Sequence, residues 1–64
     1  MKIKYDKAVD VIYLQFSAGP VSESDNEKPG IILDYSEDGS IVGIEILDAS
    51  KKFPQPIKIE YEIA

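Results

Sequence analysis

Apolar and polar side chains alternate with a period of two along most of the chain. The alternation is clearest in five segments rich in β-branched and aromatic residues: Lys2–Tyr5, Val11–Phe16, Ile31–Tyr35, Ile41–Leu47 and Ile57–Ile63. A period of two over so few residues is typical of half-buried strands rather than of helices. Glycine and proline pairs separate the segments and favour turns. The polar stretch Val21–Asn26 fits either a loop or a weak edge strand.

The strongest local signal is a hairpin centred on Asp38-Gly39. This pair predicts a two-residue type I′ turn, in which both residues adopt positive φ. The turn sets a register with six apolar side chains on one face: Tyr35 opposite Val42, Leu33 opposite Ile44, and Ile31 opposite Ile46. A shift by one residue would spoil this match, because the side-chain period is two. The other face then has Ile32 opposite Glu45, and Asp34 opposite Gly43.

A short helix is expected between the last two strand segments. Asp48 is a residue type that caps helix N-termini, and Lys51 and Lys52 suit the negative end of the helix dipole. Pro54 then stops the helix. Residues 1–64 are therefore predicted to form a single domain, mainly β (small α+β). We expect five or six short antiparallel strands in hairpins, with one short helix near residues 48–53.

Composition narrows the chemistry that this domain could perform. The 64 residues contain no Cys, His, Trp, Arg or Thr, and 12 carboxylates against seven lysines give a net charge of −5. The absence of Cys and His removes the usual zinc and iron–sulfur ligands and the commonest general base. An acidic chain without Arg argues against nucleic-acid binding. We expect no cofactor and no enzymatic activity.

The chain also lacks sequence signals for a membrane. Its longest apolar run is Val11–Leu14, and its N-terminus Met1–Asp6 has no hydrophobic signal segment. The expected location is therefore the cytoplasm.

One motif suggests a cation site in place of the hairpin. Residues 34–45 match the twelve-residue loop of an EF-hand, with oxygen ligands from Asp34, Ser36, Asp38 and Glu45. The flanking sequence opposes this interpretation, because an EF-hand needs a helix before the loop and Pro29-Gly30 disfavours one. We therefore prefer the hairpin and keep a small calcium-binding protein as the alternative.

Apolar residues on both faces of the strands point to association. Ile32 and Leu47 lie on the second face of the predicted sheet, where a one-layer sheet should be polar. The chain's own helix, a second copy or another protein could cover them. The segment Ile57–Ile63 contains no proline to block pairing at an edge. We predict a homodimer, with Ile32 and Leu47 or Ile57 and Ile59 at its interface, and the acidic charge suits a small basic protein partner.

Several segments resemble a known family. They are Met1–Asp6, Asp10 with Ile12–Leu14, Pro29–Tyr35 and Asp38–Lys51. Together they are similar to the family called domain of unknown function 2283, over residues 1–52. The resemblance implies a compact, mostly β, cytoplasmic prokaryotic protein without an assigned catalytic residue. Members are often encoded beside other very small proteins, which implies an antitoxin-like or other partner-binding role.

Overall fold

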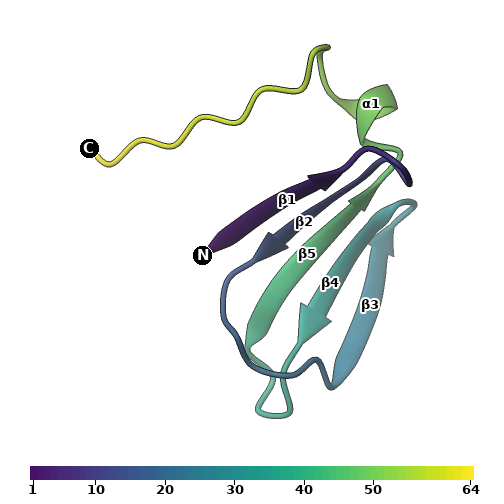
Figure 1. Cartoon of the computed structure of the whole chain (residues 1–64). Coiled ribbons are helices and arrows are strands. Elements are labelled where there is room, and N and C mark those ends of the chain that lie inside the picture. Colours follow the sequence, from purple (N-terminus) through teal and green to yellow (C-terminus); the bar gives the residue numbers. More distant parts are fainter.

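Five antiparallel strands form one sheet, and a single short helix follows the last of them (Figure 1). The computed structural model describes all residues from 1 to 64. Its elements are β1 (Lys2–Asp6), β2 (Val11–Gln15), β3 (Glu23–Lys28), β4 (Ile31–Tyr35), β5 (Ile41–Leu47) and α1 (Ala49–Lys52). The sheet order is β1-β2-β5-β4-β3. The predicted mainly β class is confirmed, and the ambiguous stretch Val21–Asn26 contributes to edge strand β3. The four-residue helix is too short to cross a bilayer.

The turn between β4 and β5 differs from the predicted type I′ turn. Gly39 has a positive φ of 87°, but Asp38 does not. The Ser36 N–H donates to the Ser40 carbonyl at 2.8 Å, and the Gly39 N–H donates to the Ser36 carbonyl at 3.0 Å. These bonds enclose a three-residue loop, Glu37–Gly39, with glycine in the left-handed position. The prediction of a two-residue turn was therefore wrong.

The register of the hairpin is correct along most of its length. Leu33 lies opposite Ile44, as predicted, and the two neighbouring pairs toward Ile31 also agree. Tyr35, however, lies opposite Ile41 and not opposite Val42. The three-residue loop shifts the pairing by one residue at Tyr35. A β-bulge between Tyr35 and Asp34 then restores the predicted register.

The pairing divides the side chains of the sheet into two faces. Residues directly opposite each other on neighbouring strands share a face. The face that we call the apolar face carries Ile3, Tyr5, Ile12, Leu14, Ile31, Leu33, Ile44 and Ile46. The opposite face, the mixed face, carries Lys2, Lys4, Val11, Tyr13, Gln15, Ile32, Asp34, Gly43, Glu45 and Leu47.

Few residues of this sheet are buried. The six buried residues are Val11, Ile12, Asp34, Val42, Gly43 and Ala49. Extensive contacts join only neighbouring strands, because α1 is too short to form a second layer. Most side chains of the apolar face are therefore only half-buried.

The predicted sixth strand, Ile57–Ile63, is not formed. The chain after α1 is an extended tail, residues 54–64, which makes no backbone–backbone hydrogen bond (Figure 1). The side chains of Tyr61 and Ile63 are 82% and 79% exposed. Pro54 and Pro56 lack N–H donors at the start of the tail, and residues 57–64 form no backbone hydrogen bond with a strand edge.

Candidate functional site

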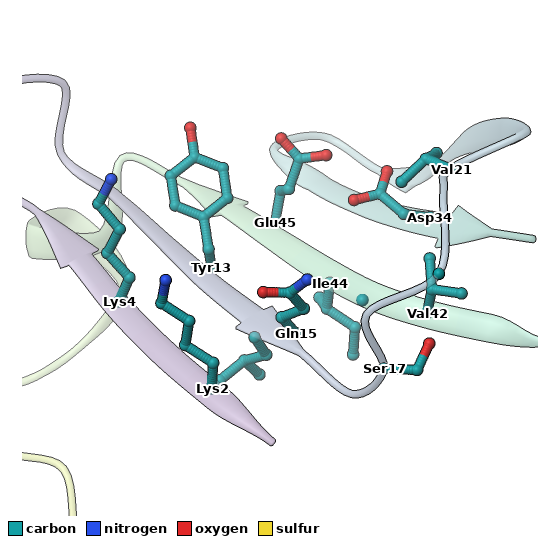
Figure 2. A pocket seen from close by; sticks show the side chains of 13 residues that line it. Lys2, Lys4, Tyr13, Gln15, Ser17, Val21, Asp34, Val42, Ile44 and Glu45 are labelled. Atoms are coloured by element: carbon teal, nitrogen blue, oxygen red, sulfur yellow. The ribbon is translucent and has the colours of Figure 1, made fainter.

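A hollow of about 280 Å³ lies on the mixed face of the sheet (Figure 2). Lys2 and Lys4 of β1 flank it on one side, and Asp34 and Glu45 of β4 and β5 flank it on the other. Gly43 of β5 also lines it, and Ser17 and Val21 of the loop between β2 and β3 lie at one end. The hollow therefore has cationic groups from one strand and carboxylates from two others.

The backbone beside the hollow requires glycine at position 43. A Cβ built at Gly43 would lie 2.8 Å from the carbonyl oxygen of Leu14, which belongs to the backbone of β2. Only glycine allows β2 and β5 to approach this closely. The sequence shows an isolated glycine within a strand pattern, which is the signal for such a close approach.

Two carboxyl groups beside Gly43 interact directly. Asp34 is buried, and its Oδ1 accepts a hydrogen bond of 2.7 Å from the Ser24 hydroxyl. A hydrogen bond with Asp34 raises the pKa of Glu45, and burial and the negative charge of Asp34 raise it further. A second negative charge beside Asp34 is unfavourable, so Glu45 holds its proton more strongly than an isolated glutamate does. The two carboxyl groups can thus attract a positively charged group.

The four predicted calcium ligands are not brought together. Asp34 and Glu45 lie on the mixed face, whereas Ser36 and Asp38 lie at the hairpin loop. The Asp38 carboxylate accepts bonds from the Ser36 hydroxyl at 2.5 Å and from the Ser40 N–H at 3.0 Å, which lower its pKa to about 2. No group of three acidic side chains is placed to hold a metal ion. The EF-hand motif is therefore part of a β-hairpin and lacks the helices that its family requires.

Asp10 has a structural role that the sequence does not reveal. It has a positive φ of 57° after β1, and its carboxylate accepts bonds from the Tyr5 hydroxyl at 2.8 Å and from the Ser50 hydroxyl at 2.6 Å. It also accepts the Ser50 N–H at 3.0 Å. Bonds from Ser50 and Tyr5 lower the pKa of Asp10. Asp10 thus ties the start of α1 to the first hairpin.

This arrangement corrects the predicted helix cap. Asp48 precedes α1 with a positive φ of 52°, but its side chain makes no capping bond. The cap comes from Asp10, which is 40 residues away from Ser50 in the chain. Local capping patterns cannot identify a cap that depends on tertiary contact.

A second hollow lies between the tail and the apolar face. We call it the tail groove; its volume is about 460 Å³. Its sheet side consists of Ile3, Ile12, Leu14 and Ile46, and its other side consists of residues 53–60, including Ile57 and Ile59. The groove is open, so these apolar side chains cover one another only in part.

The predicted interface residues fall into two places. Ile57 and Ile59 line the tail groove, whereas Ile32 and Leu47 lie half-buried on the mixed face. Most side chains of the apolar face, which the alternation predicts as a core face, are also only half-buried. A role for Ile32 and Leu47 at an interface stays a prediction.

The total accessible surface also indicates incomplete packing. It is 5040 Å² for a mass of 7.1 kDa. A folded monomer of this mass exposes roughly 4,100 Å². The excess of about 900 Å² is close to the area that one partner buries in a standard protein interface, about 800 Å².

Comparisons with known proteins agree with the family resemblance. Residues 2–50 match a family model described as "Protein of unknown function (DUF2283)". The chain is 42% identical over 53 residues to an uncharacterized protein of Methanocaldococcus jannaschii. This match covers 83% of the chain and 45% of the relative, so the chain spans less than half of that relative's length. No solved structure matches the chain. The family match includes the whole sheet and ends before the tail.

Proposed function

Since the chain belongs to the DUF2283 family of proteins of unknown function, we propose its role from its geometry: a non-enzymatic interaction module that works as a homodimer. The observation that carries this proposal is the apolar face, which the chain covers only in part, by its extended tail. A 64-residue domain without metal or disulfide is marginally stable alone, and oligomerisation is a common remedy. A two-fold dimer would bury the same face of both copies.

The chemistry of the surface supports binding rather than catalysis. Neither His nor Cys is present to serve as a nucleophile or base. Edge strand β3 is fully exposed and carries Glu23, Asp25 and Glu27. This acidic edge suits a small basic protein as a further partner of the dimer.

Sedimentation velocity between about 1 and 100 µM tests the homodimer. We expect a species of twice the 7.1 kDa chain mass at the higher concentrations. Ile3→Glu, at a 39% exposed position of the apolar face, should weaken this dimer and leave the circular dichroism of the sheet intact. Gln15→Glu, on the mixed face, is the matched control. A single-chain species at every concentration, with a concentration-independent melting temperature, would contradict the proposal.

A further inference from the structure

Two segments of the chain carry unused backbone hydrogen-bonding groups. β1 pairs with β2 on one side only, so its outer edge is free. The tail makes no backbone–backbone hydrogen bond, although its residues from Ile57 onward are extended and free of proline. An extended segment and a free edge are the two components of strand addition.

The side chains of the two segments match in a single antiparallel register. In this register Lys58 lies opposite Asp6, and the pairing continues along five positions. The pairs are Lys58–Asp6, Ile59–Tyr5, Glu60–Lys4, Tyr61–Ile3 and Glu62–Lys2. Three pairs join opposite charges and two join apolar side chains, both of which are favourable cross-strand combinations. The apolar pairs extend the apolar face, and the charged pairs extend the mixed face.

Neighbouring registers lack this match. A shift of two residues in one direction places Lys58 opposite Lys4, and a shift in the other direction places Glu60 opposite Asp6. Both shifts set like charges directly against each other, which is unfavourable. A shift of one residue moves the glutamates to the apolar face. Charge and burial therefore select the same register.

The tail forms no backbone hydrogen bond with this edge within its own chain, although Ile59 of the tail and Ile3 of β1 line the same groove. Pro54 and Pro56 line the tail groove together with Ile12 of β2 and Ile46 of β5. The root of the tail thus lies over the apolar face, whereas a sixth strand must lie beside β1 in the plane of the sheet, about 4.8 Å away. In Figure 1 the tail leaves α1 as an extended segment outside the sheet, and it forms no backbone hydrogen bond with β1.

We propose that the tail of each copy adds as a sixth strand to the free edge of β1 in a second copy. The inference rests on the homodimer of the proposed function and names the segment that joins its two chains. Exchange about a two-fold axis gives hydrogen-bond partners to the backbones of both tails and both β1 edges, because the same contact is made twice. It also covers Tyr61 and Ile63, the most exposed apolar side chains of the tail.

Disulfide trapping tests the register and the source of the strand. The chain has no cysteine, so Ile3→Cys with Tyr61→Cys introduces the only two thiols. Directly opposed residues lie about 4.5–5.5 Å apart between Cα atoms, within the range of a disulfide. We expect oxidation to give a covalent dimer on a non-reducing gel. The control, Ile3→Cys with Ile59→Cys, is two residues out of register and should cross-link at least roughly tenfold more slowly.

The outcomes separate this inference from the proposed function. Thiol loss without a covalent dimer would show that the tail closes on its own chain, and it would overturn the exchange. Equal cross-linking of both variants would overturn the register. A wild-type dimer that neither variant traps would leave the homodimer intact and contradict strand exchange, whereas a wild-type monomer in sedimentation would contradict both.

Charge reversal provides a second test without cysteine. Glu60→Lys should raise the dimer Kd by roughly threefold to tenfold, because the lost pair occurs at two junctions. Lys4→Glu in the same chain should restore the wild-type Kd by re-creating an opposite pair. An unchanged Kd in Glu60→Lys, or the absence of rescue, would overturn the proposed pairing.

Discussion

β5 and the tail segment Ile57–Ile63 are similar in sequence but differ in structure. Both contain seven residues, both alternate, and both are rich in isoleucine. β5 lies at the centre of the sheet, between β2 and β4. The tail segment pairs with no strand. Alternation therefore makes a segment able to form a strand, and an available neighbouring edge decides whether the strand forms.

The difference follows from how each segment is connected. A three-residue loop delivers β5 directly to β4, and two ladders then compensate for the conformational entropy that β5 loses. The tail leaves α1 over the apolar face, where it has side-chain neighbours but no backbone partner. Changes in β5 should therefore unfold the sheet, whereas changes in the tail should act on association.

Among the variants that test this comparison, Gly43→Val should lower the free energy of unfolding most, because it disrupts β5 at its contact with β2. The new Cβ would lie 2.8 Å from a backbone oxygen that cannot move without breaking the ladder. We expect a loss of about 3 kcal/mol or more in the free energy of unfolding, measured by urea denaturation. Gly19→Val is the control, since the nearest atom to its Cβ is a serine hydroxyl at 3.8 Å. A wild-type unfolding midpoint for Gly43→Val would refute the close approach.

Gly39→Val should act on the loop that delivers β5. A Cβ here meets nothing within 4 Å, so the effect comes from the positive φ of 87° alone. We expect a loss of about 1–2 kcal/mol in the free energy of unfolding. Gly39→Asn should recover much of this loss, because asparagine tolerates the left-handed region. Equal stabilities for the two variants would argue against a left-handed residue in this loop.

Asp10→Asn tests how the Asp10 carboxylate stabilises α1, the helix that links β5 to the tail. The pKa of Asp10 is lowered in the folded protein, so its carboxylate stabilises the fold above its ordinary pKa of 3.8. This stabilisation is lost as the pH falls through the lowered folded pKa. We expect a lower melting temperature than wild type at pH 7 and convergence at strongly acidic pH. Asp48→Asn is the control, and a pH-independent difference for Asp10→Asn would contradict the role of the carboxylate.

Glu45→Gln should have the smallest effect, and it should be stabilising at pH 7. A raised pKa means that Glu45 stabilises the fold below its ordinary pKa of 4.5 and that this contribution is lost as the pH rises through the folded pKa. Glutamine removes the charge facing Asp34 and keeps a hydrogen-bond donor. We expect a higher melting temperature than wild type at pH 7 and no advantage near pH 4. Glu37→Gln, in the exposed hairpin loop, is the control, and no gain at pH 7 would argue against the pair.

Most of the sheet was predictable from side-chain alternation, because each hairpin brings its strands together locally. The Leu33–Ile44 register followed from the hydrophobic pattern. The three-residue loop was missed because its choice depends on backbone bonds between Ser36 and Ser40, which a turn dipeptide does not specify.

The features that depend on contacts between distant residues were harder to predict from the sequence. The cap of α1 comes from Asp10, and the need for glycine at position 43 comes from the backbone of β2. The pattern of Ile57–Ile63 predicts a strand that the structure does not form, because the pattern contains no information about which edge is available. The separation of Asp38 from Glu45 likewise follows from pairing rather than from motif spacing.

Hydrogen–deuterium exchange of the backbone amides in residues 57–63 tests the central claim most directly. A strand formed with a second copy protects alternate amides of the tail, and protection should rise with protein concentration as the dimer forms. The amides of β5 should be protected at all concentrations. The account predicts strong tail protection at hundreds of micromolar and weaker protection at the same concentration after Glu60→Lys. Exchange of the tail at the unfolded-chain rate, in a sample that sediments as a dimer, would contradict it.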